Sequence, residues 1–365
     1  MTISLCMIVK NEQDVIERCL KCGEKIADEI IIVDTGSYDN TKEICYKYTN
    51  KVYDFDWCDD FSQARNYAFS KATKEYIIWL DADDIIDTEN INKILELKNS
   101  TIKKSVDVYM LKYATSFDKA GNILFYYYRE RIIKNCNLAF WQGRVHEVIV
   151  PFGTIEYFEI VIEHRKNYDN LDLEYSNRNL RIYRNMIFEN CKFSARDNYY
   201  YARELFFHRY YNEALEFFEK VIKDESSWIE NKIDSYIISA KCYYILNDID
   251  NFLKYLMIGN TIDTPRSEFC CKLGEYFLKI NNITQAIFWF KSALNCEKKQ
   301  NSGAFIEADY YYYIPCLNLC VCLDKIGKFE EAFEYNKKAG DFKKDSEAVI
   351  FNNIYFNSKL KGSEF

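Results

Sequence analysis

The pattern of apolar residues changes once along this chain, near residue 170, and that change limits the folds available to it. Before this point, short β-type runs alternate with amphipathic helical segments, which is typical of parallel βαβ units. After about residue 172 the strand signal disappears and helical periodicity takes over. The 365 residues therefore divide into an α/β domain over residues 1–170 and an all-α domain over residues 171–361.

The first domain is predicted to hold a Rossmann-like mixed sheet. We expect strands at residues 4–9, 29–33, 52–55, 76–80, 108–113, 123–133 and 155–162, and helices at residues 12–22, 39–48 and 61–72. Ligand sites of open parallel sheets lie at the carboxyl ends of the strands. The acidic residues at those ends, Asp34 and Asp81, are therefore the first candidates for chemistry.

Glycine is too sparse for a glycine-rich phosphate loop. No two of the 11 glycines lie closer than ten positions, so neither a dinucleotide fingerprint nor a P-loop can occur. A bound diphosphate would therefore need positive charge from another source, such as a metal ion. Asp81, Asp83 and Asp84, which could hold such an ion, directly follow an apolar strand. Carboxylates are the hard oxygen ligands that Mg²⁺ and Mn²⁺ prefer, so a divalent metal is expected here.

Charge and cysteine content limit partners and compartment. The formal net charge of −8 argues against a nucleic-acid surface, which needs a basic footprint. No run of 18 apolar residues exists, so no transmembrane segment is expected. The 14 cysteines occur in a large chain without an apolar signal segment, which favours reduced thiols and a cytoplasmic location. Cys19 and Cys22 form a C-x-x-C within a helical pattern, and core packing is favoured over metal binding.

Small residues recur through the second domain at a spacing close to 34 positions. They pair as Ala202 with Ala214, Ala240 with Phe252, Gly274 with Ala286, and Cys320 with Ala332. This register resembles the tetratricopeptide repeat, in which small residues let two helices approach closely. In the fourth unit Asn336 stands where an aromatic residue is expected. An irregular helical bundle is the alternative.

Five phrases converge on one known family. They are Ser4–Glu12, Asp34–Ser37, Asp60–Asn66, Trp79–Asp84 and Trp141–Glu147. Together they resemble family-2 glycosyltransferases with the A-type nucleotide-sugar fold, in the bacterial subgroup that carries C-terminal tetratricopeptide repeats. That subgroup includes enzymes that glycosylate flagellin and bacteriocin precursor peptides. The resemblance implies inverting, metal-dependent transfer of a sugar such as N-acetylglucosamine or another hexose from a UDP-sugar donor.

The resemblance assigns five residues to binding of the nucleotide-sugar: Asn11, Glu12, Asp34, Arg65 and Asp81. Asp34 would read the base, Asp81 would contact the ribose, and Arg65 would contact the nucleotide or the diphosphate. Two structural alternatives stay open. Asp34 could cap the turn that follows it, and Arg65 could pair with Asp59 or Asp60 on the surface.

The resemblance also implies a metal site and a base. Asp83 and His164 would bind Mn²⁺ or Mg²⁺, with His146 orienting the sugar or phosphate, and the two histidines could exchange roles. Inversion needs a base that removes the acceptor proton, and Glu147 is the candidate. Glu147 could instead accept a sugar hydroxyl. Trp141 is suited to pack against the sugar ring, and a core position is equally open.

The helical repeats suggest how an acceptor is bound. Stacked helix pairs form a concave surface suited to extended peptides or to self-association as a homodimer. We therefore expect a protein or peptide acceptor, such as flagellin, modified on Ser, Thr or Cys. Two alternatives stay open: a glycosyltransferase of cell-surface polysaccharide synthesis, and a repeat-based binding scaffold with a degenerate catalytic half.

Overall fold

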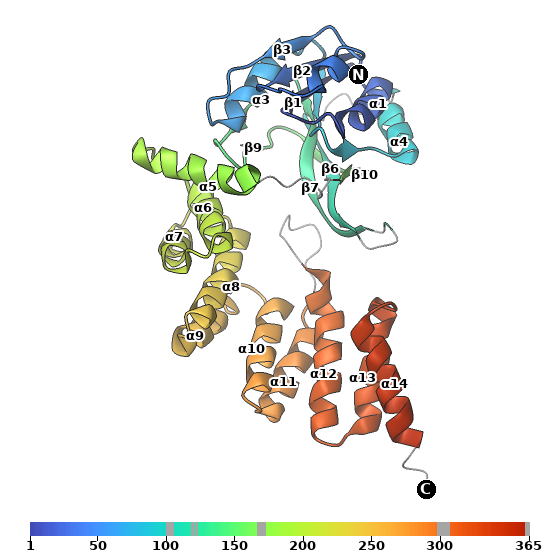
Figure 1. The fold of residues 1–365 in the computed structure, drawn as a ribbon, viewed down its shortest axis with the longest axis vertical. Helices are drawn as coiled ribbons and strands as arrows, with labels where there is room; N and C mark the ends of the chain where they lie inside the picture. Colours follow the sequence, from blue (N-terminus) through green and yellow to red (C-terminus); the bar gives the residue numbers. More distant parts are fainter. Residues whose placement is uncertain (100–105, 118–120, 122, 166–172, 298–306, 362–365) are drawn as a thin grey trace. The chain divides into compact units, whose positions relative to one another are not determined.

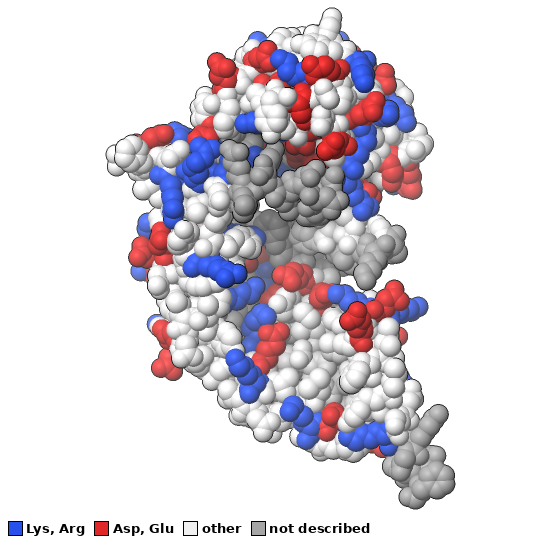
Figure 2. Space-filling view, in the orientation of Figure 1, with Lys and Arg blue, Asp and Glu red and all other residues white. Residues whose placement is uncertain are grey.

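The computed structural model describes residues 1–99, 106–117, 121, 123–165, 173–297 and 307–361 (Figure 1). Contacts divide the chain into two compact units, Met1–Lys192 and Phe193–Phe365, each with hydrophobic clusters of its own. Acidic and basic side chains are interspersed on the face shown in Figure 2. The domain boundary expected at residues 170 and 171 lies outside the described residues and stays a prediction.

The first unit is built on a large mixed sheet and a small two-stranded sheet. The strands are β1 (Ile3–Val9), β2 (Glu29–Asp34), β3 (Val52–Asp54), β4 (Tyr76–Trp79), β5 (Asp84–Ile85), β6 (Val108–Phe117), β7 (Ile123–Lys134), β8 (Trp141–Gln142), β9 (Val148–Ile149) and β10 (Ile155–His164). The large sheet has the order β3-β2-β1-β4-β7-β6-β10-β5, and β8 pairs with β9. Strands β1 to β4 are parallel, whereas β7 is antiparallel to β4 and β6. The expected Rossmann-like mixed sheet is confirmed.

Alternating side chains along β1 enter two hydrophobic clusters, one for each face of the large sheet. The helices of this unit are α1 (Ile16–Ile26), α2 (Thr41–Cys45), α3 (Phe61–Ser70), α4 (Thr88–Asn99) and α5 (Leu173–Phe188). Leu5 and Met7 share one cluster with residues of α1, α2 and α4. Cys6 enters the other cluster, with residues of α3, β8 and β9. Because β2, β1 and β4 are parallel neighbours in the sheet, their carboxyl ends lie together at one edge.

Helix α5 belongs to the first unit by its contacts. Arg181 donates hydrogen bonds to both carboxylate oxygens of Asp59, at 2.6 and 3.0 Å. Just after the helix, Glu189 pairs with Arg144 at 2.6 Å. The helix is thus tied to the loop before α3 and to the segment between β8 and β9. Helical periodicity alone does not reveal this, because it does not say against which unit a helix packs.

The second unit is a series of paired helices. They are α6 (Ala195–Phe207), α7 (Tyr211–Lys223), α8 (Ile229–Ile245), α9 (Ile249–Gly259), α10 (Ser267–Lys279), α11 (Ile283–Leu294), α12 (Tyr313–Lys325), α13 (Phe329–Phe342) and α14 (Glu347–Lys361), with a 3₁₀ turn at Ala308–Tyr311. Small residues expected at the repeat positions, such as Ala202 and Ala214, are buried. At Gly274 an added Cβ would lie 2.7 Å from the Phe290 ring, so the close approach of α10 and α11 requires glycine. The expected helical-repeat architecture is confirmed.

Asn336 occupies the position in the fourth helix pair where the repeat pattern has an aromatic residue. Its side chain is completely buried and donates hydrogen bonds to the carbonyl of Val349 at 3.1 Å and to Asn353 Oδ1 at 3.0 Å. Its own Oδ1 accepts a hydrogen bond from Asn352 at 2.9 Å. A polar network therefore joins α13 to α14 where the other repeats would place an aromatic ring.

The helices of the first unit differ from the sequence-based expectation in several places. Helix α2 spans only Thr41–Cys45, where a helix over residues 39–48 was expected. Helix α1 begins at Ile16 and not at residue 12, because the carbonyl of Glu12 accepts the N–H groups of Val15 and Ile16 in a turn that precedes the helix. Helix α4 was not predicted. Its first turn is stabilised by Asp87, whose carboxylate accepts the N–H of Asn90 at 2.7 Å.

The cysteines are all free thiols, and most of them are buried. Cys19 is buried and Cys22 is half-buried within α1, in agreement with a packing role. Burial raises the pKa of Cys320 to about 12. Only Cys58 and Cys136 are exposed. In the part of the chain that the structure describes, no helix has the length and apolar character needed to cross a bilayer.

Candidate functional site

The loops after β1 and β2 lie side by side at the carboxyl edge of the sheet. The N–H of Asn11 donates to Ser37 Oγ at 2.9 Å, and Asn11 Oδ1 accepts the N–H of Tyr38 at 3.0 Å. Asp34 is 1% exposed, and its carboxylate accepts the N–H groups of Gly36 at 3.0 Å and Ser37 at 2.7 Å. Asp34 therefore caps its own turn, which is the structural alternative left open above. Its base-reading role stays a prediction.

Glu12 lies next to Asn11 where the chain bends into α1. Its N–H donates to Thr41 Oγ1 at 2.7 Å, at the start of α2. Asn11 has a φ of 54°, in the left-handed region that asparagine tolerates well. The bend keeps Asn11 and Glu12 beside the loop that holds Asp34, as the resemblance implies.

Three aspartates after β4 meet a histidine at the end of β10. His164 Nδ1 lies 3.1 Å from Asp83 Oδ1 and 3.2 Å from Asp84 Oδ1. One ligand atom from each of Asp81, Asp84 and His164 lies within 4.8 Å of the others. Burial alone would lower the pKa of His164, but hydrogen bonds with Asp83 and Asp84 outweigh burial and raise the pKa to about 9. The structure thus brings together the two predicted metal ligands.

Asp84 is fully buried, and its carboxylate already has protein partners. Arg131 Nη1 donates to Asp84 Oδ2 at 3.0 Å and to the carbonyl of Trp79 at 3.1 Å. The hydroxyl of Tyr113 donates to Asp84 Oδ1 at 3.1 Å. Sequence reasoning missed Arg131. The signal was present, because a charged residue inside the apolar strand expected at residues 123–133 has to be paired when buried.

Arg65, on α3, joins two acidic residues from different segments. Its Nε donates to Glu147 Oε1 at 2.7 Å, and its Nη2 donates to Asp81 Oδ1 at 2.8 Å. The guanidinium lies 5.1 Å from the ring centroid of Trp79 and 4.8 Å from that of Trp141. Burial disfavours the charged form of Asp81, but Arg65 outweighs burial and holds the pKa of Asp81 below its usual range.

The surface pairing considered for Arg65 does not occur. Asp60 caps α3 by accepting the N–H of Gln63 at 3.1 Å, and Asp59 binds Arg181 of α5. Arg65 instead points from the same helix into the acidic site. That alternative for Arg65 is therefore wrong.

Glu147 and His146 lie in the segment between β8 and β9. Gly143 and His146 have φ values of 95° and 51°, so the backbone turns twice before Glu147. Asn66 holds the start of the segment, because its amide donates to the carbonyl of Trp141 at 2.9 Å and accepts the N–H of Trp141 at 2.8 Å. Trp141 is only 2% exposed. This burial favours the core position for Trp141 over packing against a sugar ring.

The side chains that meet at this site suit a divalent cation. Asp81, Asp84 and His164 each offer one ligand atom within 4.8 Å of the others, and Asp83 Oδ1 lies 3.1 Å from His164 Nδ1. Of these carboxylates, Asp84 is already paired with Arg131. Carboxylates with one imidazole fit Mn²⁺ or Mg²⁺.

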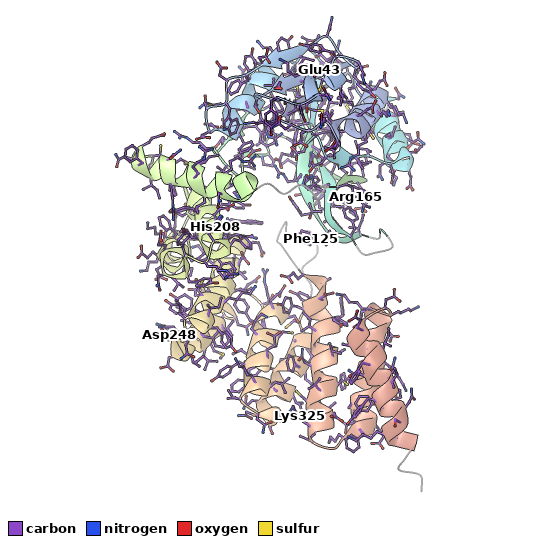
Figure 3. All side chains as sticks on the ribbon, viewed as in Figure 1. Glu43, Phe125, Arg165, His208, Asp248 and Lys325 are labelled. Atoms are coloured by element: carbon purple, nitrogen blue, oxygen red, sulfur yellow. The ribbon has the colours of Figure 1, made fainter. Side chains whose placement is uncertain are left out.

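The remaining histidine has a structural environment. His208, labelled in Figure 3, follows α6, and its Nδ1 lies 2.8 Å from the carbonyl oxygen of Glu204. This contact helps to satisfy a carbonyl in the last turn of the helix.

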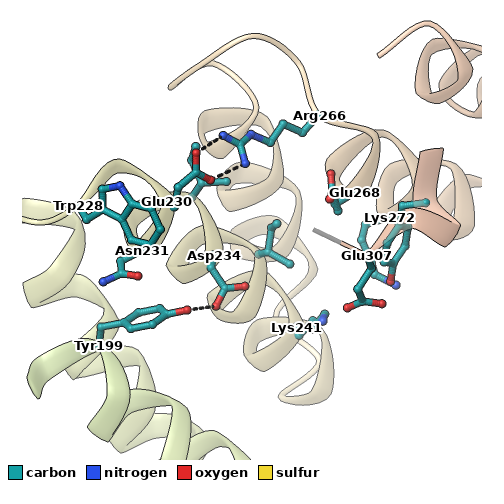
Figure 4. A pocket seen from close by; sticks show the side chains of 13 residues that line it. Tyr199, Trp228, Glu230, Asn231, Asp234, Lys241, Arg266, Glu268, Lys272 and Glu307 are labelled. Atoms are coloured by element: carbon teal, nitrogen blue, oxygen red, sulfur yellow. Dashed lines mark hydrogen bonds and ion pairs between the residues drawn. The ribbon is translucent and has the colours of Figure 1, made fainter. Parts of the chain in front are cut away.

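The second unit contains a pocket of about 50 Å³ between its helices (Figure 4). Two of the contacts in its wall are drawn as dashed lines. Arg266 pairs with both oxygens of Glu230 at 2.6 and 2.9 Å, and the hydroxyl of Tyr199 donates to a carboxylate at 2.6 Å. Trp228 and Asn231 line the same pocket, with 44% and 7% of their surface exposed.

Known proteins resemble parts of this chain. Residues 4–140 match the family Glycosyl transferase family 2. The TPR repeat-containing protein Synpcc7942_0270 of Synechococcus elongatus is 46% identical over 82 residues, 22% of this chain and 20% of that protein. The SPbeta prophage-derived glycosyltransferase SunS of Bacillus subtilis is 25% identical over 289 residues, 76% of this chain and 65% of that protein. The chain thus spans less than two thirds of the length of either relative.

A solved structure, S. aureus TarS 1–349 in complex with UDP, is similar over 71% of this chain and 91% of that chain, with 16% identity and a TM-score of 0.38. The family match covers the segments that hold Asn11, Asp34, Arg65 and Asp81, and the remaining site residues lie on the same unit. Residues 4–140 of the first unit thus match glycosyl transferase family 2, and the second unit is built of paired helical repeats.

Proposed function

We propose that this chain transfers a sugar, with inversion at the anomeric carbon, from a UDP donor to a polypeptide acceptor. The donor sugar is N-acetylglucosamine or another hexose, and the acceptor group is a Ser or Thr hydroxyl or a Cys thiol. The observation that carries the proposal is the convergence of Asp81, Asp83, Glu147 and His164 on one site, although they come from three separate segments.

The nucleotide half of the donor is proposed to lie at the loops after β1 and β2. Asn11 and Glu12 supply polar groups there, and Asp34 fixes the turn beside them. Asp81 would accept a hydrogen bond from the ribose with a carboxylate that Arg65 keeps ionised. These positions support a nucleotide held by side chains and turns, and not by a glycine-rich loop.

The diphosphate is proposed to lie near Asp83 and His164, which would hold Mn²⁺ or Mg²⁺ together with a donor oxygen. A bound divalent ion supplies positive charge that stabilises the leaving UDP. Arg131 holds the Asp84 carboxylate in place through an ion pair. Asp84 in turn helps to hold His164, whose Nδ1 lies 3.2 Å from Asp84 Oδ1.

Glu147 is the proposed base. It accepts the proton of the acceptor hydroxyl or thiol while the oxygen or sulfur atom forms a bond to the anomeric carbon. The bond between the anomeric carbon and UDP breaks at the same time. Its side chain is largely buried, and one carboxylate oxygen accepts a hydrogen bond from Arg65 Nε at 2.7 Å. His146, the adjacent residue, would orient the sugar or phosphate.

The acceptor polypeptide is proposed to bind the repeat unit, and the pocket of Figure 4 supports this. Trp228 offers an exposed ring for an apolar side chain, and the buried amide of Asn231 can serve one peptide group as both donor and acceptor. Lys241 and Asp234 line the pocket with opposite charges, which suits a polypeptide better than a polyanion. Flagellin is one candidate acceptor.

The first experiment measures release of UDP from a panel of UDP-sugars with and without Mn²⁺. We expect one donor to be cleaved preferentially, and the Asp83→Asn variant to lose the stimulation by metal while keeping its melting temperature. Asp54→Asn, which alters an exposed acid of the same unit, is the matched control. Absence of UDP release with every donor and candidate acceptor would contradict the enzymatic proposal in favour of a binding scaffold.

The second experiment identifies the acceptor by mass spectrometry after co-expression of this chain with proteins of a bacterial host. We expect one polypeptide to gain a hexose-type mass on Ser, Thr or Cys. The Asn231→Ala variant should reduce this modification at least about tenfold while UDP release in the absence of acceptor stays unchanged. A product found only in polysaccharide would overturn the polypeptide assignment.

A further inference from the structure

Arg65 makes one contact with each side of the proposed reaction centre. Nε reaches Glu147, 82 positions away in the sequence, and Nη2 reaches Asp81, 16 positions away. The planar guanidinium carries these two donors in a fixed geometry, so both carboxylates are held at a set separation. A lysine at this position would offer a single point charge on a flexible stem.

The guanidinium has little freedom to move. Trp79 and Trp141 lie within cation–π distance, and both rings are buried. The arginine side chain itself is about 10% exposed. Such surroundings favour a fixed bridge over a side chain that swings toward a ligand.

Helix α3 holds the segment of Glu147 at two more points. The next residue on the helix, Asn66, makes two hydrogen bonds with the backbone of Trp141. At the start of the helix, the N–H of Phe61 donates to the carbonyl of Arg144 at 2.9 Å. These contacts anchor the segment at Trp141 and Arg144, and the hydrogen bond from Arg65 holds it further along, at Glu147.

We propose that Arg65 is a positioning residue that orients Glu147 toward the acceptor and fixes its distance from Asp81. This inference rests on the proposed function for the identity of the reaction. It differs from the assignment of Arg65 to donor binding, because it makes Arg65 act through Glu147. A positioning role affects the rate of transfer, whereas a contact to the nucleotide or diphosphate affects the affinity for the donor.

Kinetics and binding distinguish the two roles. In Arg65→Lys and Arg65→Gln we expect kcat to fall about 100-fold, the loss typical of a displaced catalytic group. The Kd for UDP with Mn²⁺ should change less than about tenfold, an effect that arises through the contact of Arg65 with Asp81. The double variant Arg65→Gln/Glu147→Gln should be no slower than Glu147→Gln alone, because both changes remove the same oriented carboxylate. A loss of UDP affinity as large as the loss of kcat would overturn the proposal.

Hydrogen exchange tests the same proposal without turnover. Arg65→Gln should accelerate amide exchange around Glu147, at residues 145–149, at least about tenfold relative to the unchanged chain. Arg181→Gln, which breaks a bidentate arginine–carboxylate pair elsewhere on this unit, is the matched control and should leave that segment unchanged. Unaltered exchange in Arg65→Gln would overturn the positioning role, and it would do so even if no donor is ever cleaved.

Discussion

Arg131 and Asp84 form an ion pair at 3.0 Å in which neither side chain is exposed to solvent. The pair joins β7, in the antiparallel part of the sheet, to the acidic segment after β4. Arg131 Nε and Nη2 have no hydrogen-bond partner among the described residues, and the guanidinium instead faces the rings of Trp79 at 3.6 Å and Tyr113 at 4.0 Å. Both charged side chains are thus removed from water, and their pairing holds the Asp84 carboxylate beside His164.

Removing one partner of this pair should be costly. Arg131→Met is expected to lower the free energy of unfolding of the first unit by about 3–5 kcal/mol, because it removes the arginine that pairs with the buried Asp84 carboxylate. Urea denaturation followed by tryptophan fluorescence measures this loss. The double variant Arg131→Met/Asp84→Asn should regain part of it, and a single-variant loss below about 1 kcal/mol would show that Asp84 is not held in this way.

Acid should destabilise the first unit partly through Glu29. Burial alone would raise the pKa of Glu29, but contacts with Lys51, Ser4 and Thr73 outweigh it and lower the pKa from 4.5 to about 2. The folded state binds this proton less tightly than the unfolded state, so the stabilisation is present above pH 4.5 and is lost as the pH falls toward 2. The amount is at most about 3 kcal/mol.

The variant Glu29→Gln isolates this contribution. Its disadvantage relative to the unchanged chain should be largest at pH 6 and should shrink between pH 4.5 and 2, as measured by urea denaturation at each pH. Glu24→Gln, a change at an exposed acid of α1, serves as the control. A constant difference across this range would contradict the assignment.

A fragment that ends at residue 192 should be more stable than one that ends at residue 170. The shorter fragment loses α5, including Ile182 and Tyr183, which are both completely buried. Burial of such side chains is worth about 2 kcal/mol each, or a difference of roughly 5 °C or more in Tm for a unit of this size. Circular dichroism melting of the two fragments provides the test. Equal melting temperatures would mean that α5 does not stabilise the first unit.

The exposed ion pair made by α5 should matter less than its buried side chains. Arg181→Gln in the longer fragment removes an ion pair whose arginine is 54% exposed, and such pairs contribute about 1 kcal/mol or less. A larger effect in this variant than in the truncation would show that the ion pair, and not apolar burial, docks the helix.

Replacing Asn336 by Leu should destabilise the second unit even though the repeat pattern favours an apolar residue there. The change leaves Asn352 and the carbonyl of Val349 without their partner, which typically costs about 1–3 kcal/mol. Thermal melting of the second unit measures the effect. Asn318→Leu is the control, because the amide of Asn318 bonds only a carbonyl of its own helix. A stabilised Asn336→Leu variant would show that the network is dispensable.

Local patterns made much of this fold predictable. Strands such as β1 and β4 follow from short apolar runs, and the helix pairs follow from small residues such as Gly274 at repeat spacing. The approach of Asp83 to His164 was anticipated from the family resemblance and not from periodicity. These features depend on residues close in sequence or on motifs with a known arrangement.

Side-chain partners across the sheet were not predictable in the same way. From the sequence, Arg65 could pair with any of several acidic residues. In the structure its guanidinium lies against Trp79 and Trp141, and this packing directs it to Asp81 and Glu147. Arg131 depends on the antiparallel placement of β7 beside β4, which the sequence pattern does not specify. Burial of Trp141 likewise depends on the second sheet that β8 and β9 form.

Two exposed cysteines allow a fluorescent label to be attached at a chosen position. Cys58 and Cys136 are the exposed thiols, so a maleimide dye would react with them before it reaches the buried ones. Cys58 immediately precedes Asp59, the residue to which α5 is bound through Arg181. With Cys136 replaced by serine, the fluorescence of a dye on Cys58 would report whether α5 is docked on the first unit or released from it.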